Sequence, residues 1–507
     1  MNSLKKRLCA VILICVSVLS LSSCFIVING PSEDTEEVTT DAPVTTAPIT
    51  SAPDPEEEGI SSEERARRRL NSLLSFDMDG ATLIMVTADN YVPAPIGSSR
   101  QIDKARWKVI NEVSERYNVE LIITRENSAY MQPKLLDARN SGLYYADIVS
   151  ILSSDLGSFF VEGLLEDLST LPFISTGAEY YYKGAVEASS VGGATYAVAG
   201  EACVNFDVFR CMYVNLNAAE KYGFGDIYST VDSGAWTYDK LLEYVKLYEY
   251  SEDGVFRGTA FSSTFEAAET VSNLFESTGV RYVYPENGEL VLYSPVGKVE
   301  QAVAALRSLC YTGNFGFVMT EEDKTRYWDE EFDELIEPTQ LQLFSDGKGV
   351  FCFGTLGDIS KVYVSKDTVV PIPAPKLNGE QEAYVTPTGG GTMLFALPSD
   401  GAYLTESAII TEALNVRSYE AVTDAYITNS LHYYIRDEKT IDSMRTIISN
   451  PYFDLSFNFG GRYGALAQNT AKTVIQAAET GLNVLDVHYW HYFGALGALE
   501  EIKNAAK

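Results

Sequence analysis

The feature that most constrains the fold is an alternation of strand and helix patterns between residues 81 and 152. Apolar residues recur at helical spacing from Ile102 to Tyr117, and a second helical pattern ends at Gly142. Three short apolar runs have the length and composition of buried strands: ATLIMVT (81–87), VELIIT (119–124) and ADIVSIL (146–152). Because strands that alternate with helices are joined by crossover connections, this region predicts an α/β fold with a parallel sheet.

The chain is long enough for more than one structural unit. It has 507 residues, 46% of them apolar, whereas a single hydrophobic core stops growing at about 250–300 residues. We therefore expect two or three units. Further helical patterns occur at 239–248, 299–309, 405–428 and 464–479.

The N-terminus has the pattern of a cleaved leader. Three basic residues, Lys5 to Arg7, precede an apolar run of 14 residues, which is shorter than the about 20 needed to span a bilayer. The run ends in Leu-Ser-Ser-Cys, which resembles the lipobox of bacterial lipoproteins. This resemblance implies a signal peptide over 1–23 and a diacylglycerol on the thiol of Cys24. The alternative is an ordinary secretory leader with an incidental cysteine.

A tether is expected after the leader. Residues 31–60 contain no Lys, Arg or aromatic residue and are dominated by Pro, Thr and acidic residues. Such a segment buries too little apolar surface to offset its chain entropy. We expect a disordered acidic Thr/Pro-rich tether over 24–66, in which the charged sequence starting at Ser61 begins a short helix that leads into the folded part.

The rest of the chain is strongly acidic. The formal charge is −32, and only nine acidic residues lie in 31–60, so most of the charge belongs to the folded part. Such a charge repels nucleic acid and anionic lipid, and we expect no nucleic-acid partner. Solubility outside the cell is the simplest explanation of this acidity.

Disulfides are permitted but not specified. Export allows them, yet four cysteines have three possible pairings, and free buried thiols are equally compatible with the sequence. The four that remain after the leader and Cys24 are Cys203, Cys211, Cys310 and Cys352.

Signatures of catalysis are absent from the sequence. It contains no G-x-S-x-G, P-loop, H-E-x-x-H or EF-hand loop. His488 and His491 lie three residues apart in HYWHYFG, without obvious further ligands, so we interpret this sequence as an aromatic packing segment. Carboxylates are too numerous for any pair to indicate hydrolysis without geometry. We therefore expect no enzyme activity, no cofactor and no metal.

Several stretches, in their order along the chain, resemble the extracellular solute-binding lipoproteins of bacterial ABC importers, of the sugar-binding family 1 type. The resemblance runs from about residue 80 to the end. It is carried by IDKARWKVINEVSERYNVELIIT, ADIVSILSSDLGSFFVEGLLEDLSTL, MYVNLNAAEKYGF, SGAWTYDKLLEYV, FSDGKGVFCFGTLGDI and PIPAPKLNGEQEAYVTPTGGGTMLFALPS.

Two positions need comment within this resemblance. Sugar binders of the family often have a stacking tryptophan just after the strand that FCFGT matches, but this chain has Gly354 to Asp358 there. This departure weakens part of the sugar assignment. Trp236 matches a family tryptophan, and we expect it to pack the start of the following helix rather than to bind ligand.

The resemblance implies a two-lobed periplasmic-binding-protein-like α/β fold, with a parallel-type sheet in each lobe and the ligand cleft between them. Lobe one would comprise 67–200 with 375–427, and lobe two 201–374 with 428–507. More than one strand would cross the hinge that joins the lobes.

The candidate ligand residues follow from sheet topology and from the resemblance. Open α/β sheets bind ligands beyond the carboxyl ends of their strands, which favours the loops after 81–87 and 146–152. Asp155 has an equally supported alternative role as the N-cap of the next helix. The predicted ligand-binding residues are Asp89, Asn90, Ser153, Asp155, Tyr196, Gly354 and Asp358.

The function implied is capture of a small solute, a sugar or oligosaccharide, and its delivery to an ABC permease. The protein would be an extracytoplasmic monomer, held on the cell membrane by the Cys24 lipid. Two alternatives stay open: a surface enzyme that acts on glycans, and a glycan sensor or adhesion protein that uses the same fold without transport.

Overall fold

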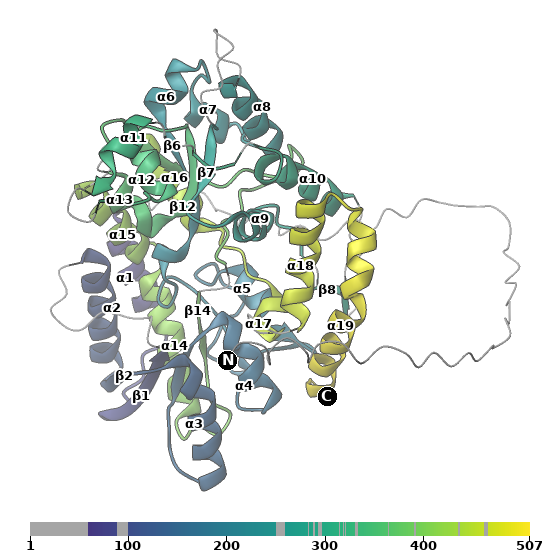
Figure 1. Ribbon diagram of the computed structural model, residues 1–507. Coiled ribbons are helices and arrows are strands. Elements are labelled where there is room, and N and C mark those ends of the chain that lie inside the picture. Colours follow the sequence, from purple (N-terminus) through teal and green to yellow (C-terminus); the bar gives the residue numbers. More distant parts are fainter. Residues whose placement is uncertain are drawn as a thin grey trace, which may run out of the picture. The chain divides into compact units, whose positions relative to one another are not determined.

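The first sheet contains the strands expected from the sequence. In the computed structural model (Figure 1), β1 (Ala81–Ala88) pairs in parallel with β2 (Val119–Glu126) and β3 (Ile148–Leu152). The parallel prediction is therefore confirmed for these three strands. A fourth strand, β14 (Met393–Ala396), comes from far along the chain and pairs antiparallel to β3, so that the order is β14-β3-β1-β2.

The structure describes residues 59–88, 100–249, 259–281, 283–286, 289–292, 297–313, 315–317, 319, 321–329, 333–363, 365–389, 392–433, 437–460 and 465–506.

Turn residues end the helices of this region where the sequence indicates. Helix α2 (Gln101–Tyr117) is followed by Asn118 at φ 47°, and α3 (Ser128–Ser141) by Gly142 at φ 64°. Both residue types tolerate this left-handed conformation, which stops a helix and turns the chain back to the sheet.

The second sheet has a topology that the sequence did not reveal. Its strands are β6 (Arg210–Asn215), β7 (Phe261–Ser263), β12 (Phe351–Thr355) and β13 (Val369–Ile372), in the order β13-β6-β12-β7. Only β12 and β7 are parallel, because β6 runs opposite to both of its neighbours. The expectation of a parallel-type sheet in each lobe is thus corrected: both sheets are mixed.

A cluster of stacked aromatic rings forms the core beside the second sheet. Trp236 is fully buried, donates its Nε1–H to the Pro373 carbonyl at 2.8 Å, and stacks on Phe351 with ring centroids 5.5 Å apart. The packing role expected for Trp236 is confirmed. Around this core lie α8 (Tyr238–Glu249), α9 (Ala267–Glu276), α10 (Lys298–Cys310) and α18 (Ala465–Thr480).

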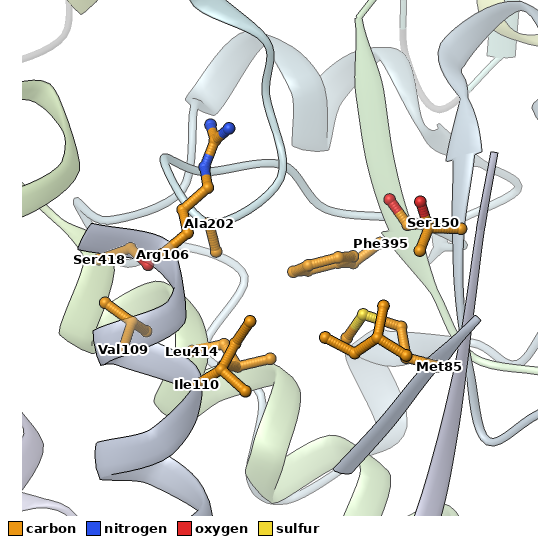
Figure 2. A pocket seen from close by; sticks show the side chains of 11 residues that line it. Met85, Arg106, Val109, Ile110, Ser150, Ala202, Phe395, Leu414 and Ser418 are labelled. Carbon is orange, nitrogen blue, oxygen red and sulfur yellow. The ribbon is translucent and has the colours of Figure 1, made fainter. Parts of the chain in front are cut away.

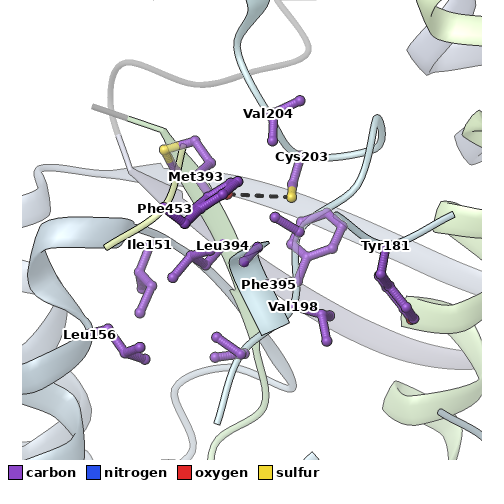
Figure 3. Packing of buried hydrophobic residues seen from close by; sticks show 14 of the residues in the cluster. Ile151, Leu156, Tyr181, Val198, Cys203, Val204, Met393, Leu394, Phe395 and Phe453 are labelled. Atoms are coloured by element: carbon purple, nitrogen blue, oxygen red, sulfur yellow. Dashed lines mark hydrogen bonds between the residues drawn. The ribbon is translucent and has the colours of Figure 1, made fainter. Parts of the chain in front are cut away.

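The first core contains a free thiol. Cys203 is buried among side chains of β3, β14 and residues 198–204, and its Sγ lies 3.6 Å from the Met393 carbonyl oxygen (Figure 3). Cys211, Cys310 and Cys352 are also buried and free, so none of the four forms a disulfide.

Several segments join the two sheets. Helix α15 packs on α2 beside the first sheet, whereas α16 packs on β13 of the second. Helix α18 contacts α9 and α10, and it lies side by side with α19, which also touches α4 (Figure 1). The predicted lobe boundaries stay predictions, and the C-terminal helices contact elements around both sheets.

The remaining described α-helices are α1 (Ser62–Ser72), α4 (Leu156–Val161), α5 (Lys183–Ala188), α6 (Leu216–Lys221), α7 (Ile227–Asp232), α11 (Glu321–Arg326), α12 (Gln340–Ser345), α13 (Ile359–Val362), α14 (Leu404–Ser418), α15 (Ala421–Tyr433), α16 (Glu438–Ser449), α17 (Leu455–Gly460) and α19 (Val484–Ala505). Short 3₁₀ turns are η2 (Ser153–Asp155), η3 (Leu168–Thr170), η4 (Phe206–Val208) and η5 (Leu356–Asp358). Two-stranded ribbons are β4 (Ser190–Val191) with β5 (Ala194–Thr195), β8 (Val283–Glu286) with β9 (Glu289–Leu292), and β10 (Trp328–Asp329) with β11 (Glu334–Leu335). Among the described helices, none combines the length and apolar character that crossing a membrane requires.

Ion pairs join helix α1 to helices α2 and α14. Arg417 of α14 has no exposed side-chain surface, and it contacts Glu63 of α1 and Glu112 of α2, each at 2.5 Å. Burial between two carboxylates makes this guanidinium the link between α1, α2 and α14. The first described helix of the chain, α1, is therefore attached to the helices beside the first sheet.

Candidate functional site

The predicted ligand residues near the first sheet fall in different environments. Ser153 is buried and lines a hollow of about 20 Å³ together with residues of α9 and α17. Tyr196 packs edge-on against Phe160, with ring centroids 4.9 Å apart, and lines none of the hollows described below. Asp89 and Asn90 lie outside the described residues.

Asp155 does not cap the helix that it precedes. It occupies the N-cap position of α4, but its carboxylate accepts no backbone N–H there. The only hydrogen bond to its carboxylate among the described residues comes from the Ser154 hydroxyl at 3.4 Å, and burial raises the pKa of Asp155 to about 6. The capping alternative is thus not realised, and ligand binding by Asp155 stays a prediction.

The predicted residues of the second sheet lie at its carboxyl edge. Gly354 is buried in β12, and a Cβ there would meet Asp358 Oδ2 at 3.2 Å. Asp358 accepts from the backbone N–H and the hydroxyl of Thr355, both at 3.0 Å, and from Lys361 Nζ at 2.8 Å. Asp358 therefore shapes the turn after β12, and it also lines the large hollow that opens there.

A large hollow of about 920 Å³ opens at the carboxyl ends of β7 and β12. Its wall is built by the residues just after β7, by the start of α12, and by the turn after β12. This is where open α/β sheets place their ligands. The volume lies near the upper end of the about 300–1,000 Å³ typical of ligand sites, so it has room for more than one sugar ring.

The wall of the large hollow combines aromatic faces with short polar groups. Phe265, Phe315 and Tyr327 supply the rings, and Gln340 and Gln342 supply amides. Two of its three carboxylates have basic partners: Arg326 contacts Asp346 at 2.9 Å, and Lys361 contacts Asp358. The third carboxylate is that of Glu266. Such a wall suits an uncharged, hydroxylated ligand, because rings cover apolar sugar faces while amides and carboxylates bond hydroxyls.

A second hollow, which we call the hinge cavity, has a volume of about 250 Å³. It lies between α9, residues 452–457 and α18, and Gly389 closes one side. Phe265 of the large hollow has the Arg210 guanidinium 5.2 Å from its ring centre. A Cβ on Gly389 of the hinge cavity would meet the same guanidinium, at 2.3 Å from Nη2.

Glu276 is the central charged group of the hinge cavity. Its carboxylate accepts the backbone N–H of Thr388 at 2.8 Å and that of Gly389 at 3.1 Å. Burial raises its pKa from 4.5 to about 7, although Arg210 and the two hydrogen bonds act in the opposite direction. The residue is half-buried and lies at the wall of the hinge cavity.

Two other polar side chains face the hinge cavity. Asn273 is 3% exposed, and its Nδ2 has no hydrogen-bond partner among the described residues. Asp454 accepts from the Tyr452 hydroxyl at 2.7 Å and from the Ser456 backbone N–H at 2.7 Å, which fixes its carboxylate at the cavity wall.

A further small cavity, inside the first core, has too little room for a solute. It lies inside the first core between α2, β1, β3 and β14, where Arg106, Ser150 and Phe395 contribute to its wall (Figure 2). Its volume of about 30 Å³ would hold only a few waters, since one water needs roughly 10–15 Å³ of such space.

The histidine segment is not a metal site in the described part of the chain, where no three potential metal ligands converge. His491 pairs with Gln476 at 3.0 Å, and His488 is buried. The interpretation of HYWHYFG as a packing segment is only partly right, because Tyr489, Trp490 and Phe493 are exposed.

Sequence reasoning missed most of the residues that line the two larger hollows. Phe265 follows β7 directly, so recognising that short strand could have drawn attention to it. By contrast, Glu276 and Asn273 lie within a helical pattern, and Asp454 lies in a loop before a short helix. Nothing local marks these three residues as neighbours.

Neither a protein-family model nor a curated protein matches this sequence. Solved structures do share its fold. The galacto-N-biose-/lacto-N-biose I-binding protein of an ABC transporter from Bifidobacterium longum, in complex with lacto-N-biose, is 13% identical, with a TM-score of 0.54 over 84% of this chain and 98% of that one.

Two further structures agree with this result. The sugar-binding protein MalE from Xanthomonas citri is 10% identical, with a TM-score of 0.53 over 84% of this chain and 97% of that one. A cyclo/maltodextrin-binding protein complexed with maltotetraose is 15% identical, with a TM-score of 0.51 over 83% and 97%. The predicted fold, that of sugar-binding proteins of ABC transporters, is therefore confirmed, and identities this low leave the ligand to be argued from the site.

Proposed function

We propose that this protein is an extracytoplasmic solute-binding protein that captures a sugar or oligosaccharide in the large hollow and delivers it to an ABC importer. The observation that carries the proposal is the large hollow itself. It combines aromatic rings with amides and three carboxylates, two of them paired with basic side chains, at the carboxyl ends of β7 and β12. The fold shared with sugar-binding proteins supports it.

Delivery would follow from a change between open and closed forms. A ligand that bridges the elements around both sheets stabilises the closed form by its higher affinity for that form. An importer that recognises the closed form would then receive only loaded protein. Genes for two permeases next to this one would support transport, and their absence would favour the sensor or adhesion alternative.

Binding is tested by a thermal-unfolding screen of neutral oligosaccharides, followed by calorimetric titration of those that raise the melting temperature. A ligand at 100 times its dissociation constant stabilises the fold by about 2.7 kcal/mol. Phe265→Ala removes a ring from the wall of the large hollow and should weaken binding at least several-fold. Trp490→Ala removes an exposed ring outside both hollows and should leave affinity unchanged.

Three outcomes would count against this function. The binding proposal fails if no oligosaccharide raises the melting temperature. Equal losses in Phe265→Ala and Trp490→Ala would place binding elsewhere on the protein. Product formation from a bound oligosaccharide would establish the glycan-enzyme alternative, since the proposal requires release of an unchanged solute.

We further propose that Cys24 carries the lipid that holds the protein on the membrane. Cys24 lies outside the described residues, so support comes from the basic start, the short apolar run and Leu-Ser-Ser-Cys. Detergent-phase partitioning of wild type and Cys24→Ala tests the anchor. Recovery of both proteins in the aqueous phase would rule it out.

A further inference from the structure

The two larger hollows differ in their charge. The large hollow is lined by three carboxylates, those of Glu266, Asp346 and Asp358, and the last two pair with Arg326 and Lys361. The hinge cavity is lined by three carboxylates, those of Glu269, Glu276 and Asp454, and no Lys, Arg or His is among its described lining residues. Two cations lie near its wall: Arg210 acts on Glu276, and Arg281, which pairs with Glu187, acts on Tyr452 beside Asp454. Three carboxylates therefore face at most two cations.

The hinge cavity also contains polar groups that can form hydrogen bonds with a ligand. The Asn273 amide group is buried at its wall with an unused donor. Ser272, Gln468 and the fixed carboxylate of Asp454 add further polar atoms. A buried donor without a partner destabilises the unliganded protein, so a ligand that offers an oxygen atom to Asn273 would recover that cost.

We propose that the hinge cavity binds the protonated amine of an amino sugar, which narrows the ligand class of the proposed function and rests on that function. An ammonium group donates three hydrogen bonds and accepts none, which complements carboxylate acceptors. A neighbouring hydroxyl oxygen of the same sugar ring would accept from Asn273 Nδ2. The cavity volume of about 250 Å³ lies just below the range of drug-sized sites, which suits a single ring.

A metal ion does not explain the carboxylates. In the described part of the chain, no three potential metal-ligating side chains converge. Two of the carboxylates are also fixed by hydrogen bonds, Glu276 to the backbone of Thr388 and Gly389, and Asp454 to Tyr452 and Ser456. The three carboxylates are spread around the wall of the hinge cavity, an arrangement that suits a polyatomic cation.

Binding of a cation in the hinge cavity should change the protonation of Glu276. The pKa of Glu276 is about 7, and the charged groups that face it are Arg210 from β6 and Asp454 from the segment before α17. An added positive charge favours the ionised carboxylate and lowers its pKa. An amine ligand should therefore release protons from Glu276 when it binds near neutral pH, whereas a neutral sugar should not.

The test compares three series of β-1,4-linked oligosaccharides that differ only at C2: glucosamine, N-acetylglucosamine and glucose. Calorimetric titration is carried out at about pH 6, where the free amine is already protonated and Glu276 still holds its proton. Two buffers of different ionisation enthalpy give the affinity and the number of protons released. We expect the glucosamine series to bind at least tenfold more tightly than the other two, with net proton release.

Two matched variants test whether the preference for the amine and the proton release both arise in the hinge cavity. Glu276→Gln keeps an oxygen acceptor for the Thr388 and Gly389 N–H groups and should abolish both the preference and the proton release. Glu220→Gln removes one exposed carboxylate on α6, outside all hollows, and should change neither.

The inference is overturned if the acetylated or glucose series binds as tightly as the amine series, or if Glu276→Gln keeps the preference. The proposed function survives both results, because a sugar is still bound. Absence of binding by all three series also overturns the inference, whereas the proposed function is judged by its own wider screen.

Discussion

Glu201 allows a quantitative test of how burial of one carboxyl group makes the free energy of unfolding depend on pH. It is 7% exposed and lies, along the chain, after β3 of the first sheet and before β6 of the second. Its carboxylate accepts the backbone N–H of Glu420 at 2.9 Å and that of Thr423 at 2.8 Å, at the start of α15. Burial outweighs these bonds and raises its pKa from 4.5 to about 7.

The sign of the pH dependence follows from this shift. Because the folded state holds the proton more tightly than the unfolded state, the contribution of Glu201 to stability is fully present below about pH 4.5 and is lost as the pH rises through about 7. Between about pH 5 and pH 8 the free energy of unfolding should fall by about 2–3 kcal/mol from this group alone.

The measurement compares wild type with Glu201→Gln by urea unfolding at several pH values. Other titrating groups, Glu276 among them, contribute to both proteins and cancel in the difference, provided that the sites are independent. The wild-type stability should decline relative to the variant by about 2–3 kcal/mol from pH 5 to pH 8. Glu220→Gln, an exposed control, should show a constant difference. A constant difference for Glu201→Gln as well would refute the argument from burial.

Three further predictions concern packing and the site. Arg417→Met removes the buried guanidinium that links Glu63 and Glu112, but both carboxylates are part-exposed and keep Lys108 and Arg67 as partners. The free energy of unfolding, measured in urea, should therefore fall by about 1–3 kcal/mol for the lost charged hydrogen bonds. Gly157→Ala places a Cβ 1.9 Å from the Phe459 carbonyl oxygen, so the melting temperature should fall as α4 and α17 separate; an unchanged value would contradict that contact. Asp155→Asn should weaken calorimetric affinity for the solute, by about 1.5–3 kcal/mol for a lost charged hydrogen bond, without lowering the unliganded melting temperature; unchanged affinity would exclude Asp155 from the site.

Site residues were predictable only where they follow a recognisable strand. Ser153 and Asp155 could be named because ADIVSIL is an evident strand and ligands gather beyond such strand ends. Asp358 was reached through the resemblance to solute-binding proteins, and the structure places it at the large hollow. Tyr196, chosen by the same route, packs edge-on against Phe160, and its role in ligand binding stays a prediction.

The sequence by itself determined the local elements of this protein. Periodicity located β1, α2, β2, α3 and β3, and Asn118 and Gly142 end their helices because each readily adopts the left-handed conformation. The parallel pairing of β1 to β3 also followed, since strand–helix alternation leaves little choice of direction.

Tertiary structure alone decided the rest. The antiparallel placement of β14 and β6 depends on pairing between distant segments, which no local pattern encodes. The hinge cavity likewise joins Asn273 and Glu276 of α9 to Gly389 and Asp454. Glu276 is an ordinary helical glutamate in the sequence. Its raised pKa arises only when packing removes water from it, because desolvation is a property of the folded surroundings and not of the residue.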